Sequence, residues 1–265
     1  MSRLICLHGF GGGPESWAAV QRLMPSSWTC VCPRLYGHGP AGEVLFPEPA
    51  GIPGEAARIL AMLETQGLWH GTAHLEPLQP KPKPKPWLVG YSLGARVALG
   101  MLAQAPTLFQ GALLIGVNPG LQDEQTRLQR LHTDEAWACL LEQEGLDSFW
   151  HAWEQQPIFE RQRLLEPHKQ VQQQQLRAHL DARGLVQAMR VLSLAKMPDY
   201  TPLLSRLELP LHLLVGAEDL KFRALMRALE PILPRAILEE VPGCGHNVVL
   251  ELPESILSSL HRLMS

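Results

Sequence analysis

The sequence has few charged residues and no long hydrophobic run. Charged side chains make up 18% of its 265 residues, and the net charge is −3. This balance lacks the basic surface that nucleic-acid-binding proteins use. No run reaches the roughly 18 apolar residues of a membrane helix, and no basic region followed by an apolar stretch marks a secretion signal at the N-terminus. We therefore expect a cytoplasmic protein that binds neither nucleic acid nor membrane.

Cysteine is scarce as well. The five cysteines are Cys6, Cys30, Cys32, Cys139 and Cys244. An odd number in a chain of this length argues against a disulfide framework. Cys30 and Cys32 form a C-x-C pair rather than a redox C-x-x-C, and we expect buried thiols there and at Cys6. The eleven histidines are scattered without metal-ligand spacing, so the sequence predicts no metal site and no cofactor.

Hydrophobic residues make up 46% of the chain, which is enough for the core of one α/β domain. Short apolar runs predict six strands, at 4–7, 28–32, 87–91, 111–117, 211–215 and 236–241. Helical spacing predicts helices at 55–66, 93–105, 220–229 and 253–263. Strands that alternate with helices predict an α/β fold with a mostly parallel sheet, covered on both faces.

Two segments interrupt this alternation. Residues 80–86 alternate proline and lysine, a pattern that forms neither helix nor central strand, and we interpret them as an extended linker. Residues 121–200 are rich in Gln, Arg, Glu and Leu, with helical spacing and no strand run. We expect a core made of residues 1–120 and 202–265, with a helical cap inserted at 121–201.

One motif stands between a predicted strand and a predicted helix. Gly90-Tyr91-Ser92-Leu93-Gly94 has the pattern G-x-S-x-G. The pattern places the serine on a sharp turn, where small neighbours let other backbone pass close by. The helix after it directs its first N–H groups at the same point, which favours negative charge there. Ser92 is therefore a candidate catalytic residue.

A serine hydroxyl needs a histidine that accepts its proton, and the histidine needs an acid that orients it. Asp219 directly follows one predicted strand, and His246 lies on the loop after the next. Because the carboxyl ends of parallel strands meet at one edge of a sheet, we expect Ser92, Asp219 and His246 to converge. Glu218 is the competing acid. We favour Asp219 because the spacing G-x-x-D after this strand is common in enzymes that carry the G-x-S-x-G motif.

The glycine-rich loop after the first strand supplies a further element. In folds with this motif, one backbone N–H of the oxyanion hole follows the nucleophile, here at Leu93, and the second comes from an early loop, here at Phe10. We expect Phe10 also to form a wall of the pocket. His8 is then interpreted as a structural histidine rather than a second base.

The chain as a whole resembles one family of the α/β-hydrolase superfamily, the 2-succinyl-6-hydroxy-2,4-cyclohexadiene-1-carboxylate synthases of menaquinone and phylloquinone biosynthesis. The motifs that carry the resemblance span nearly the whole chain: His8-Gly9-Phe10, residues 90–96, Pro119-Gly120-Leu121-Gln122, Trp153 with Gln155-Gln156-Pro157, Ser193-Leu194-Ala195, Asp219-Leu220-Lys221-Phe222 and Gly245-His246-Asn247. The resemblance implies a lyase that removes pyruvate from 2-succinyl-5-enolpyruvyl-6-hydroxy-3-cyclohexene-1-carboxylate through triad-assisted proton abstraction. It also implies an α/β-hydrolase fold. We expect a sheet of about six strands, because this sequence departs from the family in lacking the fold's usual first two strands.

The family substrate carries three carboxylates, so its site should be cationic. Arg96 lies one helical turn after Ser92, within reach of the sharp turn at residues 90–94 that carries Ser92, the nucleophile elbow. The resemblance implies a set of substrate-binding residues: Tyr91, Arg96, Gln122, Arg127, Trp153, Arg177 and Lys221. Guanidinium groups suit a small anionic substrate because they bind carboxylates bidentately. Glu154 departs from the family pattern, since a tyrosine often follows the cap tryptophan.

Two other functions fit the same motifs. A serine hydrolase of esters or carbon–carbon bonds would share the triad but would not need the basic residues. A non-catalytic binding protein on the same fold would need no triad at all. The sequence does not determine the oligomeric state.

Overall fold

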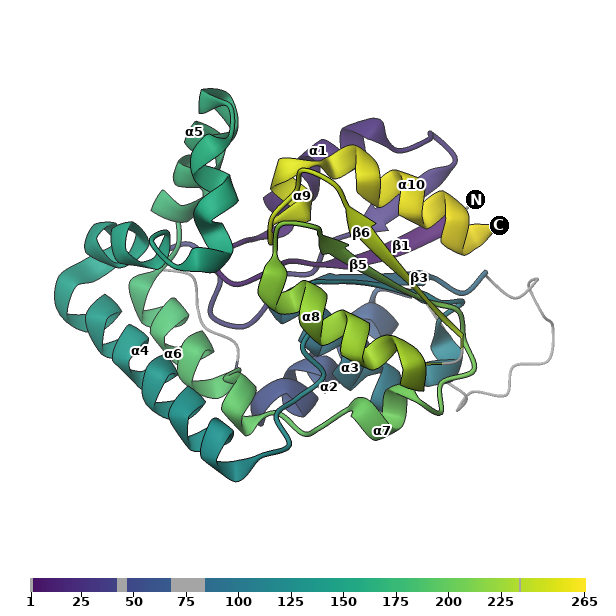
Figure 1. Cartoon of the computed structure of the whole chain (residues 1–265), viewed down its shortest axis with the longest axis horizontal. Helices are drawn as coiled ribbons and strands as arrows, with labels where there is room; N and C mark the ends of the chain where they lie inside the picture. The colour runs from purple at the N-terminus through teal and green to yellow at the C-terminus, as the bar shows by residue number, and fades with distance from the viewer. Residues whose placement is uncertain (1, 42–46, 68–83, 234) are drawn as a thin grey trace.

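The computed structural model describes residues 2–41, 47–67, 84–233 and 235–265, and shows one sheet flanked by helices (Figure 1). The strands are β1 (Ser2–Leu7), β2 (Trp28–Val31), β3 (Trp87–Tyr91), β4 (Ala112–Ile115), β5 (Leu211–Gly216) and β6 (Ala236–Val241). Their order in the sheet is β2-β1-β3-β4-β5-β6, and every neighbouring pair is parallel. The predicted α/β fold with six strands is confirmed.

Helices cover both faces of the sheet. One face packs against α2 (Gly51–Thr65), α3 (Leu93–Gln104) and α8 (Leu220–Leu229), and the other against α1 (Ala18–Leu23), α9 (Val248–Glu251) and α10 (Pro253–Met264). Alternate residues of β1 face opposite sides, with Ile5 and Leu7 in the first core and Leu4 and Cys6 in the second. Three short 3₁₀ turns complete this part: η1 (Pro14–Trp17), η2 (Pro106–Leu108) and η5 (Glu230–Ile232).

Between β4 and β5 the described chain forms helices only. In order they are α4 (Glu124–Trp153), η3 (Pro157–Leu164), α5 (Pro167–Ala178), α6 (Ala182–Val191), η4 (Leu194–Lys196) and α7 (Thr201–Leu204). Figure 1 shows α4, α5 and α6 beside the sheet rather than over its faces. We propose 121–201 as the extent of the cap, which this helical composition supports.

The long helix α4 is interrupted at Gly145, where φ is +76° and ψ is −177°. Glycine alone adopts this backbone conformation without strain. The segment after the break carries Phe149, Trp150 and Trp153. Phe149 and Trp150 belong to a small apolar core of the cap, with Leu185 of α6 among its members.

Three further predictions concern regions outside the site. Residues 80–83 of the proposed linker lie outside the described residues. Across the helices that the structure describes, none is both long enough and apolar enough to cross a membrane. The five cysteines are all free thiols.

Candidate active site

Ser92 lies on the turn between β3 and α3 with φ +51° and ψ −108°, and among the described residues no other non-glycine residue has a positive φ. Glycine on both sides allows this turn. A Cβ on Gly94 would lie 2.2 Å from the carbonyl oxygen of Leu7, and one on Gly90 would lie 2.6 Å from Cα of Ala95. Strain of this kind persists only where the surrounding structure enforces it, and it is found at functional sites.

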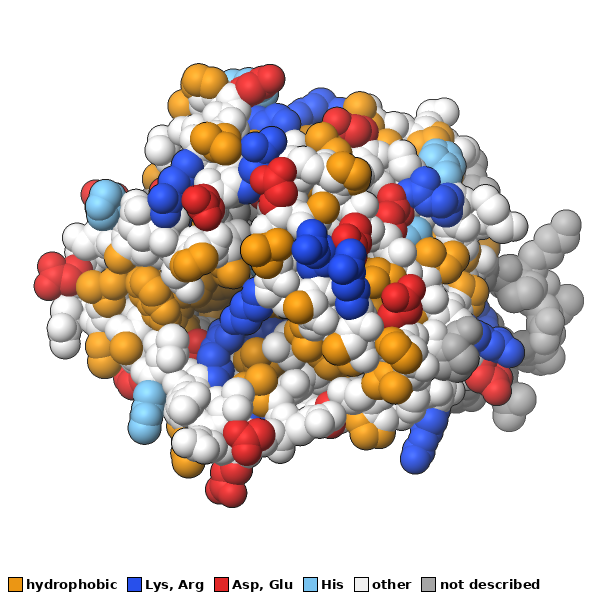
Figure 2. Space-filling view, viewed as in Figure 1, with side chains coloured by type: hydrophobic (Ala, Val, Ile, Leu, Met, Phe, Trp, Pro, Cys, Tyr) orange, Lys and Arg blue, Asp and Glu red, His pale blue; other side chains and the backbone are white. Residues whose placement is uncertain are grey.

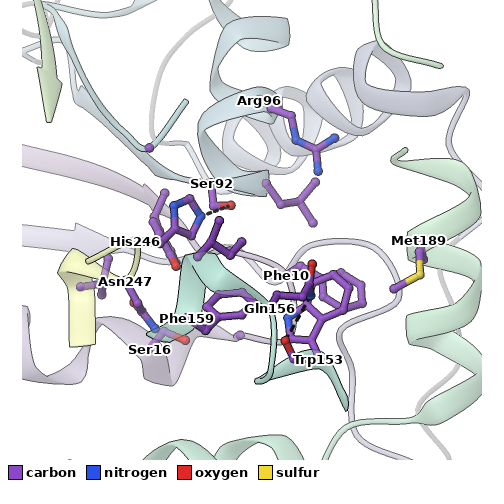
Figure 3. Close-up of a pocket in the computed structure, with 18 of the residues that line it drawn as sticks. Phe10, Ser16, Ser92, Arg96, Trp153, Gln156, Phe159, Met189, His246 and Asn247 are labelled. Carbon is purple, nitrogen blue, oxygen red and sulfur yellow. Dashed lines mark hydrogen bonds between the residues drawn. The ribbon is translucent and has the colours of Figure 1, made fainter. Parts of the chain in front are cut away.

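The three predicted catalytic residues lie together. The Ser92 Oγ is 3.1 Å from Nε2 of His246 (Figure 3). On the other side of the ring, Nδ1 of His246 is 2.6 Å from Oδ2 of Asp219. Asp219 and His246 are each 3% exposed. A carboxylate can only accept a hydrogen bond, so Nδ1 carries the proton and Nε2 is free to accept one from Ser92. This is the arrangement that a general base and its proton donor require.

The competing acid points elsewhere. The Glu218 side chain is 48% exposed and its carboxylate lies 3.5 Å from Nε of Arg161. Asp219 also accepts a hydrogen bond from the Phe222 N–H and so begins helix α8. Of the two adjacent acids, the structure brings Asp219 to the histidine.

A buried carboxylate positions the histidine loop. Glu251 is 5% exposed and accepts hydrogen bonds from the backbone N–H groups of Gly245 (2.6 Å) and Asn247 (3.0 Å), on either side of His246. Gly116 approaches the imidazole so closely that a Cβ there would lie 3.0 Å from Cε1. Glu251 was not predicted from the sequence, although it is an acid only five residues after the histidine, at the end of the short helix α9.

Three aromatic rings surround the imidazole of His246. Ring centroids lie 4.5 Å away for Phe222, 5.5 Å for Tyr91 and 6.1 Å for Phe159. These rings limit the access of water to the Asp219–His246 pair. A pair shielded in this way interacts more strongly than it would in water.

Phe10 and Leu93, the predicted oxyanion donors, both line the pocket beside Ser92. Leu93 is the first residue of α3, where backbone N–H groups have no partner within the helix. The ring of Phe10 packs 5.2 Å from that of Trp153. His8 lies behind this loop, with its Nδ1 2.9 Å from the Gly9 carbonyl oxygen and its Nε2 accepting from the Leu35 N–H. Both ring nitrogens are occupied, and burial holds the pKa of His8 well below its usual value.

A pocket of about 560 Å³ lies in front of Ser92, between the core and the cap. Figure 2 shows the hollow, with apolar side chains on its cap side and a Lys or Arg side chain at its core side. Four basic side chains line it: Arg96, Arg130, Arg177 and Lys221. Its acidic lining residues are Glu15 and Asp134. The excess of cations suits a substrate with several negative charges.

Arg96 points from α3 toward the pocket (Figure 3), and its guanidinium donates a hydrogen bond of 2.8 Å to the Leu192 carbonyl oxygen. Burial, and secondarily the charge of Arg130, lower its pKa to about 9, while Asp134 opposes that shift. Asp134 is itself held by Arg130 at 2.8 Å and by the Ser193 hydroxyl at 2.6 Å. The Arg96 cation is therefore fixed in place with donors available to the pocket.

Arg177 is 5% exposed and lies flat against a cap ring, with its Cζ 4.3 Å from the Trp150 centroid. Its guanidinium also forms an ion pair with Glu154, the residue that departs from the family pattern. Burial lowers the pKa of Arg177, while Glu154 opposes that shift. The Glu154 carboxylate therefore occupies a cation that lines the pocket, the guanidinium of Arg177.

The structure brings together most of the predicted binding residues, but two lie apart. Tyr91, Arg96, Trp153, Arg177 and Lys221 line the pocket, whereas Gln122 and Arg127 are not among its lining residues. Gln122 donates to Asp199 at 3.1 Å, and Arg127 donates to the carbonyl oxygens of Ala195 and Met197. A substrate-binding role for these two stays a prediction. Arg130, three residues after Arg127, lines the pocket and was missed, because helical spacing alone did not show which face of α4 turns inward.

Comparison with known proteins identifies the family. The model of the α/β-hydrolase family matches residues 4–257. A 2-succinyl-6-hydroxy-2,4-cyclohexadiene-1-carboxylate synthase from Klebsiella pneumoniae subsp. pneumoniae is 30% identical over 266 residues, covering 99% of this chain and 93% of that protein. The synthase of the same name from Salmonella paratyphi B is 31% identical, covering 98% and 93%.

Solved structures share the fold. MenH from S. aureus superposes with a TM-score of 0.86 at 23% identity, covering all of this chain and 95% of the other. A thermophilic esterase from Thermogutta terrifontis reaches a TM-score of 0.78 at 20% identity, covering all of this chain and 89% of the other. The predicted α/β-hydrolase fold is confirmed. The chain belongs to the α/β-hydrolase family and, within it, to the family of 2-succinyl-6-hydroxy-2,4-cyclohexadiene-1-carboxylate synthases.

Proposed function

We propose that this enzyme eliminates pyruvate from 2-succinyl-5-enolpyruvyl-6-hydroxy-3-cyclohexene-1-carboxylate to give 2-succinyl-6-hydroxy-2,4-cyclohexadiene-1-carboxylate, a step of menaquinone biosynthesis. The observation that carries the proposal is a serine–histidine–aspartate triad opening into a pocket lined by four basic side chains. Family membership supports the same reaction. The substrate is a small polyanion, and no cofactor enters the mechanism.

The reaction begins with a proton transfer. His246 takes the proton of Ser92 Oγ, and the oxygen so activated removes a ring proton of the substrate. The electron pair of the broken C–H bond moves onto the succinyl ketone oxygen, which becomes an enolate. Backbone N–H groups at Phe10 and Leu93 would stabilise this negative charge. Asp219 keeps the imidazole in the tautomer that accepts the proton and stabilises the imidazolium formed.

The second stage breaks a C–O bond. The enolate electrons return through the ring and expel the oxygen of the enolpyruvyl ether, which leaves as the enolate of pyruvate and takes up the proton held by His246. Ser92 keeps the proton removed from the ring, so the triad returns to its starting state. The ring gains its second double bond. No covalent bond to Ser92 forms, so water is neither consumed nor required at the triad.

The basic side chains have a role that hydrolysis would not give them. Arg96 lies beside the elbow, and Arg130 and Lys221 line other parts of the same cavity. A planar guanidinium forms two parallel hydrogen bonds with a carboxylate and holds it in one orientation. We propose that these contacts place the reacting C–H bond at the Ser92 oxygen.

A serine hydrolase of esters or carbon–carbon bonds is the second candidate. The triad geometry and the similar fold of the esterase favour it to the same degree as the lyase. The basic pocket favours the lyase, because neutral esters gain nothing from arginine. One experiment separates the two: pyruvate release is followed with a coupled dehydrogenase, and hydrolysis of an aryl ester is followed by its colour. We expect pyruvate release, and its absence together with rapid ester turnover would replace the lyase by a hydrolase.

The variant Arg96→Gln further separates pyruvate elimination from ester hydrolysis. Loss of one charge-assisted contact of about 1.5–3 kcal/mol should raise KM for the polyanionic substrate roughly tenfold to a hundredfold. Ester turnover should change little. Arg206→Gln is the matched control, because Arg206 is exposed on the core and lies outside the pocket lining.

We place the reaction in the cytoplasm. The free state of all five cysteines supports a reducing compartment. Fractionation of cells that express a tagged copy of the full chain would test this.

A further inference from the structure

Three thiols gather outside the active site. Cys6 lies on β1, Cys30 lies on β2, and Cys32 follows β2 directly. The Sγ of Cys30 is 3.1 Å from that of Cys6 and 3.2 Å from that of Cys32, and all three sulfur atoms lie within 4.8 Å of one another. They are the one group of three potential metal ligands that the described residues bring this close.

The sheet explains the cluster. Residues two apart on a strand share a face, which puts Cys30 and Cys32 on the same side of β2. The parallel register pairs Leu4 with Cys30 and Ile5 with Val31, so Cys6 is the next residue of β1 on that side. This arrangement could not be predicted from the sequence, because Cys6 and Cys30 are 24 residues apart along the chain.

The spacing is close to that of a metal–thiolate site. Sulfur atoms bound to Zn²⁺ at about 2.3 Å in tetrahedral geometry lie about 3.8 Å apart. The two shorter sulfur–sulfur distances would need to open by about 0.6 Å, which small rotations about the Cα–Cβ bonds provide. Thiolate ligands select soft cations such as Zn²⁺ and Cu⁺.

The surroundings favour a bound cation. The Glu15 carboxylate interacts electrostatically with the Cys32 thiol, so it contributes negative charge near the cluster. The Gln21 side-chain amide of α1 donates a hydrogen bond to the Cys32 sulfur at 3.6 Å, a contact that stabilises negative charge on that sulfur.

A cation can also reach the cluster. Cys6 is 2% exposed, but Cys30 and Cys32 are partly exposed at the edge strand β2. We propose that Cys6, Cys30 and Cys32 together bind one soft, thiophilic metal cation of the Zn²⁺ or Cu⁺ class. The bound ion would join the edge strand to β1, whose chain continues directly into the loop of Phe10.

The test uses the full chain, freed of metal and kept reduced with a phosphine. Zn²⁺ is titrated against a chromogenic chelator, and Cd²⁺ is titrated while thiolate-to-metal charge-transfer absorption is recorded. We expect one tightly bound ion per chain and an absorption change consistent with three thiolates. Binding should also raise the unfolding temperature, and the stabilisation should grow with the logarithm of the ion concentration above Kd.

Single substitutions locate the site. Cys30→Ser and Cys32→Ser should each weaken Zn²⁺ binding by at least about tenfold, because each removes a direct ligand. Cys139→Ser is the matched control, since Cys139 lies on α4 and contacts Glu135 instead. Circular dichroism establishes that each variant is folded.

Three results would overturn the proposal. They are no Zn²⁺ binding by the folded wild type, unchanged binding in both folded cluster variants, or equal loss in Cys139→Ser. If one cluster variant fails to fold, the other and the charge-transfer spectrum of the wild type still decide the question. No substrate is used, so the outcome is independent of the pyruvate elimination.

Discussion

Glu154→Gln should make the enzyme bind its substrate more tightly while making the fold less stable. Glu154 holds its carboxylate on the guanidinium of Arg177, which is a lining residue of the pocket. A substrate carboxylate that approaches Arg177 must displace or share this internal anion. Glutamine keeps the size of the side chain and its hydrogen-bonding capacity but removes the charge.

The magnitude follows from the exposure of the two partners. The Arg177 side chain is 6% exposed and that of Glu154 is 38% exposed. Two charges in contact near a protein surface interact by about 4 kcal/mol at an effective dielectric of 20. Exposure of the glutamate and solvent screening reduce this to about 1–2 kcal/mol. KM should therefore fall about fivefold to thirtyfold, and the free energy of unfolding should fall by about 1–2 kcal/mol.

The assay is steady-state pyruvate release, with thermal unfolding measured on the same samples. Glu142→Gln is the matched control, because Glu142 lies on the same helix and pairs with Arg190 outside the pocket. It should leave KM unchanged. An unchanged or higher KM in folded Glu154→Gln would contradict this prediction, and would mean that Glu154 orients Arg177 for the substrate instead of competing with it.

Three other predictions address the elbow, the histidine loop and the pH dependence of stability. Gly94→Ala should destabilise the fold by more than about 2 kcal/mol in urea unfolding, because its Cβ would lie 2.2 Å from the Leu7 carbonyl oxygen; a stable variant would contradict this geometry. Glu251→Gln should lower kcat about tenfold with little change in KM, because the Glu251 carboxylate accepts hydrogen bonds from the backbone N–H groups on either side of His246. A tenfold rise in KM with unchanged kcat would argue against a positioning role. Burial lowers the pKa of His38 from 6.5 in the unfolded chain to about 4 in the folded protein. As pH falls below 6.5, His38 therefore takes up a proton in the unfolded chain before it does so in the folded protein, which favours unfolding. Stability present above pH 6.5 should then decline by up to about 3 kcal/mol toward pH 4, and urea titrations of His38→Asn should show a shallower dependence.

The fold was predictable because its signals are local. Each of the six strands is a short apolar run, and the turn of Ser92 needs glycine at fixed positions on both sides. The triad was predictable for a related reason. Ser92, Asp219 and His246 each follow a strand of a parallel sheet, whose carboxyl ends meet at one edge whatever the details of packing.

Contacts that depend on helix orientation were not predictable. Arg127 and Arg130 lie on the same helix, and only the packing of α4 decides that Arg130 lines the pocket. Glu154 had no assigned partner until the fold brought it to Arg177, 23 residues further along. The cluster of Cys6 with Cys30 depended on the register between two strands, which the sequence does not state.

In the proposed mechanism, Ser92 and His246 remove the ring proton of the substrate, and pyruvate leaves only after that proton has been removed. The most direct measurement compares kcat for pyruvate formation in the wild type and in Ser92→Ala at saturating substrate. We expect measurable turnover in the wild type and a loss of about 10²–10⁴-fold in the variant. Equal rates in the two proteins, with Ser92→Ala correctly folded, would contradict it.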